Sequence, residues 1–233
     1  MSEIGAPGAS SANHVAYLYV LTDAGPWAPM ADMTARTMRI ARLPVLLVWA
    51  GLAMAACTRS DQAASAYDQG EYAVALAGWQ ARAQAGEAKA QYNLALLYYR
   101  GHGVAKNLDL AVQWAIKSAN QGYPLAEYTV GIMYSRGEGL KKDSQQAAAW
   151  IRRAAEQGLA IAQHDLGSLY GEGRGVPRDN VLSYMWYTLA IAGLKDKDRK
   201  FAEDNRALLA ADMAPEEIAL AEQMAAGWKK KKK

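Results

Sequence analysis

The chain has 233 residues, of which 52% are hydrophobic and 21% are charged, and its formal net charge is +3. Five lysines occupy residues 229–233, so the rest of the chain is close to neutral and lacks the basic surface of a nucleic-acid binder. The single cysteine excludes an intrachain disulfide and a multi-cysteine metal site within this chain. We interpret residues 229–233 as a solvated tail, with contact to an anionic lipid or polymer as the alternative.

The N-terminal part of the sequence is typical of an export signal. Residues 1–32 have no sustained period and are interrupted by Gly and Pro, so we interpret them as a mis-called or disordered extension, with translation starting at Met33 or Met38. Residues 33–57 carry arginines, then an apolar run, then small residues, which predicts a secretory signal too short to span a membrane comfortably.

The pair Ala55-Ala56 directly before Cys57 resembles a bacterial lipoprotein box. The resemblance implies a mature chain that begins at an acylated Cys57, and because Thr58 stands where an Asp would retain the protein, it implies sorting to the outer membrane, facing the periplasm. Residues 58–66 then form a short polar tether. The alternatives are an ordinary signal peptide, an uncleaved anchor, or a buried structural cysteine.

One phrase recurs in the rest of the chain at a fixed spacing. Ala90, Ala126 and Ala162 are separated by 36 residues each. A constant period in this range indicates supersecondary units that stack side by side. We predict an all-α fold over residues 67–194, an α-solenoid of helix-turn-helix repeats of about 36 residues. The recurring positions are Tyr98, Gly101, Gly103 and Trp114; Tyr134, Gly137, Gly139 and Trp150; and Tyr170, Gly173, Gly175 and Trp186.

The first helix of each repeat is predicted from apolar residues at i, i+4, i+7 and i+8, which lie on one helical face. A Gly-x-Gly pair ends each of these helices, and we expect it to supply the positive φ angles of a tight turn. No Lys-Ser/Thr follows the pairs and no strand precedes them, so we interpret them as turns and not as phosphate-binding loops. Close approach of a neighbouring helix is expected at the small residues within the first helices, which are Ala95, Gly131 and Gly167.

The second helix of each repeat follows Asn107, Asp143 or Asp179, whose side chains we expect to cap it. In these helices large Trp residues alternate with small Ala residues, so we predict that the Trp ladder is part of the core. A half-unit from Ala66 repeats the second-helix phrase, although Trp79 comes one residue late.

The repeat ends after the third copy, because Gly193 comes one residue early and no Gly-x-Gly follows. We therefore expect the 36-residue period to fail at this point. Two amphipathic stretches within residues 195–228 are predicted to form a polar-faced C-terminal helical cap.

The recurring pattern A-x-x-x-L-G-x-x-Y-x-x-G-x-G-V, followed by an acid, Ala and Trp, resembles the Sel1-like repeat family, a relative of the tetratricopeptide repeat. The resemblance covers residues 66–194 and implies a right-handed α-solenoid that holds another protein or peptide on its concave face. Some lipid-anchored members belong to polysaccharide export machinery. Cysteine-rich secreted members are linked to weak β-lactam binding and hydrolysis, but this chain lacks their cysteine pairs.

No catalytic, cofactor or metal site is predicted. The histidines His14, His102 and His164 form no helical pair, and Ser168 and Ser183 have no neighbouring His in sequence, which leaves a spatial triad open. We instead predict partner binding by first-helix positions left free by core packing, because Tyr and Arg often anchor interfaces. These residues are Tyr92, Asn93, Tyr99, Arg100, Tyr128, Arg136 and His164, with Leu96, Thr129, Ile132, Asp165 and Ser168 beside them.

The sequence therefore predicts a non-catalytic scaffold or adaptor displayed on a bacterial envelope membrane through Cys57, with no nucleic-acid partner. Two alternatives remain: a weak β-lactam- or glycan-acting secreted enzyme, and a structural envelope component without a discrete ligand.

Overall fold

The computed structural model describes residues 62–230, and within this range the chain is helical, without strands. The predictions for residues 1–61, including the lipidation of Cys57, lie outside the described residues, as do residues 231–233. After a short helical segment at residues 62–68, the helices are α3 (Tyr72–Gln84), α4 (Ala88–Arg100), α5 (Leu108–Asn120), α6 (Pro124–Arg136), α7 (Ser144–Glu156), α8 (Ala160–Glu172), α9 (Asn180–Gly193), α10 (Asp196–Ala210) and α11 (Pro215–Gly227).

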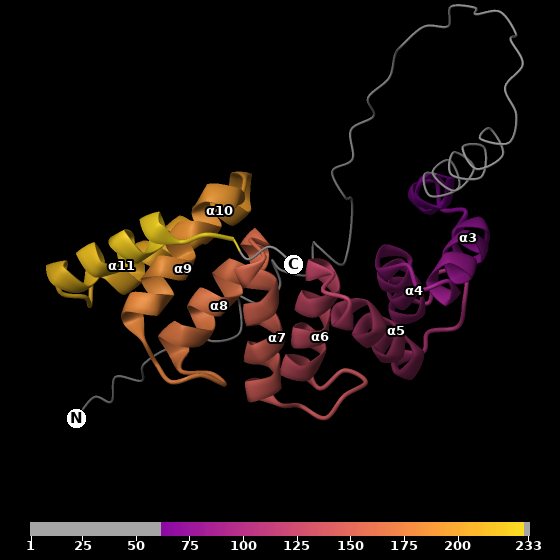
Figure 1. The fold of residues 1–233 in the computed structure, drawn as a ribbon, viewed down its shortest axis with the longest axis horizontal. Coiled ribbons are helices and arrows are strands. Elements are labelled where there is room, and N and C mark those ends of the chain that lie inside the picture. The colour runs from indigo at the N-terminus through magenta and orange to yellow at the C-terminus, as the bar shows by residue number, and fades with distance from the viewer. Residues whose placement is uncertain (1–61, 231–233) are drawn as a thin grey trace, which may run out of the picture. The chain divides into compact units, whose positions relative to one another are not determined.

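From α3 to α10 each helix packs on the next in the chain, so the helix pairs α4/α5, α6/α7 and α8/α9 stack in sequence order (Figure 1). The first helices begin at Ala88, Pro124 and Ala160, and each start lies 36 residues after the previous one. This arrangement confirms the predicted all-α solenoid of helix-turn-helix repeats.

The turns and caps form as the sequence predicts. The six glycines of the Gly-x-Gly pairs all have positive φ, for example 75° at Gly101 and 71° at Gly103. The Asn107 side chain accepts a hydrogen bond from the Leu110 N–H at 2.9 Å, and Asp143 and Asp179 cap α7 and α9 in the same way. Each repeat therefore satisfies the first N–H groups of its second helix locally.

The second glycine of each turn also has a packing task. A Cβ atom on Gly175 would lie 1.9 Å from the Ser144 carbonyl oxygen, at the start of the preceding repeat's second helix. On Gly139 it would lie 2.8 Å from Val112 Cγ2. The turn of one repeat is thus pressed against the helix start of the repeat before it.

The small residues inside the first helices allow the helix pairs to close. A Cβ atom on Gly131 would lie 2.7 Å from Ile151 Cγ1, and one on Gly167 would lie 3.0 Å from Tyr187 Cδ1. The predicted close approach is confirmed, and the approaching helix is the second helix of the same repeat.

The prediction that the Trp ladder lies in the core is wrong in part. Trp186 is 6% exposed and Trp79, which is out of register, is 5% exposed, but Trp114 and Trp150 are only half-buried. Lys117 Nζ lies 4.2 Å from the centroid of the Trp114 ring, and Arg153 Cζ lies 4.2 Å from that of the Trp150 ring. These two rings cover the seam between repeats with one face and interact with a cation on the other.

The predicted tether at residues 58–66 is also wrong where the structure describes it. Residues 62–68 are helical, and Ala63 and Ala66 are buried against α3. Ala63 fits at Gly78, where an added Cβ would lie 2.9 Å from the Ala63 Cβ. The half-unit helix α3 needs an apolar cover on its N-terminal side, and this alanine-rich segment supplies it.

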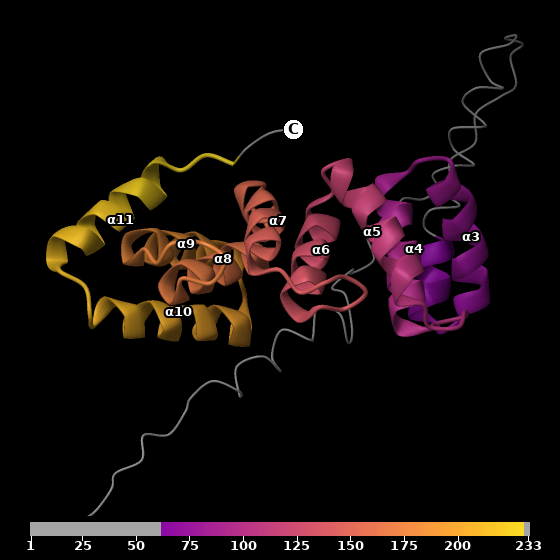
Figure 2. The ribbon, with the colours of Figure 1, turned by 90° about the horizontal axis from the view of Figure 1, so that it is seen from below.

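The repeat register continues for one more helix than expected. α10 begins at Asp196, 36 residues after the start of α8, and packs on α9 as α6 packs on α5, so the spacing of the helices continues for one helix beyond the point where the sequence pattern ends. In α10, however, Glu203 stands at the position of Ala95, Gly131 and Gly167, where a second helix must approach closely. The next helix, α11, packs on α9, and Figure 2 shows α10 and α11 diverging from their connecting loop with α9 between them.

Candidate functional site

The candidate site is the side of α4, α6 and α8 that carries the predicted partner-binding positions, which we call the first-helix face. The 36-residue register places equivalent side chains at the same level of each helix, and spacings of three, four and seven residues keep them on one side. The members of the face that remain accessible in part are Asn93, Leu96, Tyr99, Arg100, Ile132, Arg136, Asp165 and Ser168.

Tyr99 and Arg136 lie together at the boundary of the first two repeats. The Tyr99 hydroxyl donates a hydrogen bond to Glu138 Oε2 at 2.7 Å, and Arg136 Nη1 lies 3.9 Å from Glu138 Oε1. Burial raises the pKa of Tyr99, and the hydrogen bond to Glu138 raises it further. The phenol is therefore neutral at physiological pH, and the local charge is that of the Arg136–Glu138 pair.

The expectation that all the predicted partner-binding residues are left free by core packing is wrong for three of them. Tyr92 is 6% exposed, Tyr128 is 4% exposed and His164 is 1% exposed, and Thr129 beside them is also buried. The three residues occupy one register position, which the apolar pattern had not assigned to the core. Burial raises the pKa of Tyr92 to about 12.

These buried rings link successive first helices. The Tyr92 ring lies 5.3 Å from that of Tyr123, at the start of the second repeat. The Tyr128 hydroxyl donates to Asp165 Oδ2 at 2.8 Å, and the His164 ring lies 5.3 Å from that of Phe201 on α10. The position therefore contributes to the stacking of the repeats, and it is not available to a partner.

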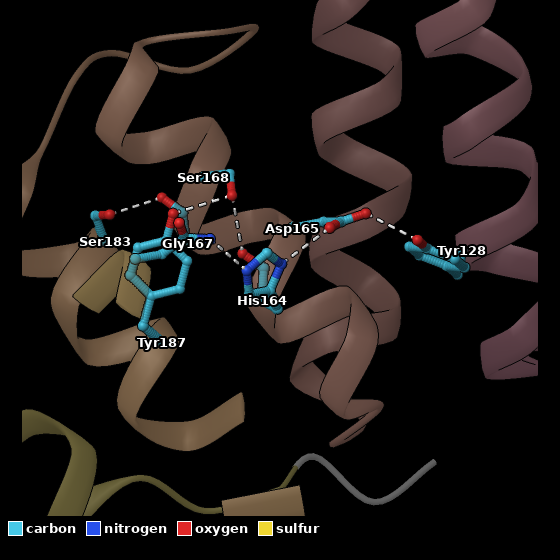
Figure 3. Close-up of polar contacts among 8 residues, drawn as sticks. Tyr128, His164, Asp165, Gly167, Ser168, Ser183 and Tyr187 are labelled. Atoms are coloured by element: carbon cyan, nitrogen blue, oxygen red, sulfur yellow. Dashed lines mark hydrogen bonds and ion pairs between the residues drawn. The ribbon is translucent and has the colours of Figure 1, made fainter. Parts of the chain in front are cut away.

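His164 lies at the centre of the polar contacts drawn in Figure 3. Its Nδ1 is 3.2 Å from Asp165 Oδ1, and its Nε2 is 3.0 Å from the Asn205 side-chain nitrogen. Because an amide nitrogen only donates, Nε2 accepts and Nδ1 carries the proton toward Asp165. The imidazole thereby joins α8 to α10.

The serines near His164 are engaged elsewhere. The Ser168 hydroxyl lies 3.0 Å from the Tyr187 hydroxyl and 3.5 Å from the His164 carbonyl oxygen, and Ser183 Oγ donates to the Gly167 carbonyl at 2.7 Å (Figure 3). The contacts with Tyr187 and Gly167 join the two helices of the third repeat. They do not form the Ser–His arrangement that activates a nucleophile.

The described residues contain neither a candidate metal cluster nor a helix suited to a membrane. Among residues 62–230 no group of three or more His, Cys, Asp or Glu side chains is placed to bind a metal ion. In the same range no helix has the length and apolar character needed to cross a membrane.

The sequence analysis missed an ion pair between a buried carboxylate and a partly exposed guanidinium group in the second repeat, and the guanidinium group also links this repeat to the first. Glu127 is fully buried; Arg153 Nε donates to its Oε1 at 3.0 Å and Gln157 Nε2 donates to its Oε2 at 2.5 Å. Arg153 Nη2 also donates to the carbonyl of Ala119, in the preceding second helix, at 3.2 Å.

The same register position is a glutamine in the other two repeats. Gln91 and Gln163 donate directly to the carbonyls of Ala83 and Ala155, at 3.1 and 3.2 Å. Because a carboxylate cannot donate this hydrogen bond, Arg153 supplies it in the second repeat. The 36-residue recurrence of Gln91, Glu127 and Gln163 was the signal in the sequence, and it marks a structural link between repeats.

These features define a class of protein: a solenoid of stacked helix pairs whose shared residues build the turns and the core and whose accessible residues on the first-helix face differ between repeats. The Sel1 repeat family model matches residues 88–123, 124–159 and 160–193. The crystal structure of a Sel1 repeat protein from Oxalobacter formigenes is 36% identical, with a TM-score of 0.52, and the match covers 55% of this chain and 97% of that one. The chain belongs to the Sel1 repeat family.

Two further relatives are more distant. A protective antigen of uropathogenic Escherichia coli strains, described as having an SLR fold, is 31% identical with a TM-score of 0.45, and the match covers 66% of this chain and 40% of that one. A sel1-like repeat-containing protein of Acanthamoeba polyphaga mimivirus is 49% identical over 39 residues, which are 17% of this chain and only 7% of the viral protein. Sel1 repeat proteins are generally protein–protein interaction scaffolds and are typically not enzymes.

Proposed function

We propose that this chain is a non-catalytic adaptor that binds a partner protein or peptide along the first-helix face. One observation carries the proposal. The residues shared by the repeats form the turns, the helix caps and the core, whereas the accessible positions on α4, α6 and α8 differ from copy to copy. Variable side chains on a rigid scaffold are the usual source of specificity in repeat proteins.

The accessible residues suit a protein interface. Leu96 and Ile132 are half-buried apolar residues at equivalent positions of α4 and α6, and Tyr99, Arg100 and Arg136 lie near them. Tyr and Arg are enriched among residues that dominate binding energy.

The proposal is tested by crosslinking in cells of the source organism, followed by identification of the captured protein. A Leu96→Glu/Arg136→Glu variant is expected to lose capture, because it places charge on the apolar positions and reverses the charge beside them. The matched control, Gln113→Glu/Lys141→Glu, makes the same charge changes at exposed positions outside the first-helix face and is expected to retain capture. Equal capture by both variants, at equal helical content, places the binding surface elsewhere.

We also propose that the adaptor is displayed on the bacterial envelope, anchored by acyl chains at Cys57 and facing the periplasm from the outer membrane. The basic and apolar composition of residues 33–56 and the small residues before Cys57 support this. Two acyl chains suffice for stable anchoring. The intact mass of the mature chain is expected to show acylation at Cys57, and Cys57→Ser is expected to release the protein from membrane fractions. An unmodified mature chain refutes the anchor while leaving the adaptor role intact.

A further inference from the structure

The accessible positions of the first-helix face change in character along the stack. The first helices of the first two repeats end in a basic residue and that of the third in an acidic one: Arg100 ends α4, Arg136 ends α6, and Glu172 ends α8. Four residues earlier stand Leu96, Ile132 and Ser168. The first two repeats thus present basic and apolar side chains, whereas the third presents acidic and polar ones.

The two arginines at the ends of α4 and α6, which form the basic end of the face, are only partly paired with carboxylates. Arg100 donates to the hydroxyl of Tyr67 and not to a carboxylate, and Arg136 is 3.9 Å from its carboxylate neighbour Glu138. Glu138 is shared, since it also accepts from Tyr99. Two guanidinium groups therefore face one carboxylate, which leaves this end with a net positive charge.

The third repeat has the opposite balance. Asp165 accepts a hydrogen bond from the Tyr128 hydroxyl and lies 3.2 Å from His164 Nδ1, and neither of these partners is a Lys or Arg side chain. Glu172 pairs with Arg174 at 2.5 Å, and both of these side chains are exposed, so the pair is well screened by solvent. Two carboxylates face one guanidinium group, which leaves a net negative charge.

We propose that the first-helix face binds an extended partner segment in one polarity, with the acidic and apolar residues of the segment on α4 and α6 and its basic residues on α8. The inference rests on the proposed adaptor function and names the partner chemistry of that same surface. Charge complementarity selects this arrangement, because the opposite polarity sets like charges against each other at both ends. With neighbouring helices about 8–10 Å apart, the face spans on the order of 20 Å, which is about six extended residues.

The test uses two synthetic ten-residue peptides of identical composition, blocked at both ends. One has its Glu and Leu residues in one half and its Lys residues in the other, and its isomer alternates Glu and Lys. Both are neutral, so net charge cannot separate them. We expect the full chain to bind the split peptide roughly tenfold more tightly by NMR titration, a preference that shrinks at high salt.

Two variants test whether the preference for the split peptide depends on the first-helix face. Arg136→Glu is expected to abolish the preference for the split peptide, and Lys141→Glu, an exposed change of the same charge outside the face, is expected to keep it. Equal binding of the two peptides, no detectable binding of either, or a preference that survives Arg136→Glu overturns the proposed polarity. The adaptor function fails separately, if crosslinking of the unaltered chain in cells captures no partner protein; capture by the Leu96→Glu/Arg136→Glu variant instead places the binding surface elsewhere.

Discussion

Tyr92, Tyr128 and His164 show that one register position can serve packing in every repeat although its residue type changes. Each side chain is buried and reaches the following first helix, through a ring contact, a hydrogen bond or both. An aromatic ring with a polar tip suits such a seam, because it buries apolar area and still satisfies a neighbouring polar group.

The buried phenol of Tyr92 predicts a loss of stability at alkaline pH. Its pKa is raised by burial from 10.0 to about 12, so the folded state favours the neutral phenol. This contribution is complete below pH 10.0 and is lost as pH rises through about 12, because the unfolded chain ionises first. The expected loss at about pH 11 is about 1.4 kcal/mol. Urea unfolding at about pH 9 and about pH 11 measures it, and Tyr92→Phe should reduce the difference; an unchanged difference in that variant contradicts the assignment.

We predict that the Glu127–Arg153 pair of the second repeat can be replaced by the residues at the equivalent positions of the first repeat. In the first repeat the equivalent residues are Gln91 and Lys117. Glu127→Gln/Arg153→Lys is therefore expected to change the free energy of unfolding by less than about 1 kcal/mol, because the introduced glutamine can itself donate to the Ala119 carbonyl. Glu127→Ala is expected to cost about 1–3 kcal/mol, since it leaves Arg153 without its carboxylate. Chemical denaturation measures the free energy of unfolding of both variants. Equal losses of stability contradict the prediction that the pair can be replaced by first-repeat residues.

Among the elements, the interhelical turn determines both the shape of a repeat and its contact with the one before. A φ of 72° at Gly175 favours glycine for conformational reasons, and the nearby Ser144 carbonyl excludes a side chain for steric ones. The two effects are separable, because Gly86 also has a positive φ, of 95°, but has no atom within 4 Å of an added Cβ.

Gly86→Ala is expected to cost about 1–2 kcal/mol, the strain of the left-handed conformation alone. Gly175→Ala is expected to cost about 2–4 kcal/mol, because the added methyl group must also displace the start of α7. Thermal or urea unfolding of the two variants measures the difference. Equal costs mean that the turn moves away from α7 without penalty, contrary to the packing described above.

At the scale of the whole described chain, stability in a repeat array is a sum over neighbouring units, and the ends need covers of their own. The C-terminal cover is α11, which meets α9 through the buried Ala221 and through Trp228, whose ring lies 6.2 Å from that of Trp186. The exposed side chains of Leu208 and Leu220 show that the predicted polar-faced cap also carries apolar residues on its surface.

Trp228→Ala is expected to lower the local opening free energy of α11 by about 1–2 kcal/mol, because it removes the ring contact with Trp186. Amide hydrogen exchange should speed up in α11 and stay unchanged in α4 to α6, since each unit depends mainly on its neighbours. Met224→Ala, at a side chain that is 36% exposed, is the control with little expected effect. Faster exchange throughout the chain indicates instead that the array unfolds as a single cooperative unit.

The sequence by itself determined the features that depend on local chemistry. The period placed the helices, the Gly-x-Gly pairs predicted positive φ angles, and Asn107, Asp143 and Asp179 predicted the caps, because each of these effects acts within a few residues. Sequence reasoning also found the accessible Tyr99, Arg100 and Arg136 of the candidate site, because these positions lie outside the apolar pattern of the first helices and because Tyr and Arg often anchor interfaces.

Only the tertiary structure decided which of the residues that vary between repeats are buried between stacked helices. The hydrogen bonds from Tyr128 to Asp165 and from Arg153 to Glu127 join residues 37 and 26 positions apart, the first between two helix pairs and the second between the two helices of one pair, and the packing of the helices determines them. The same holds for α10, which begins at the register position of a first helix, and for α11, which packs on α9. A one-dimensional pattern states which face of a helix is apolar, but the angle and distance between neighbouring helices decide which of the remaining side chains they cover.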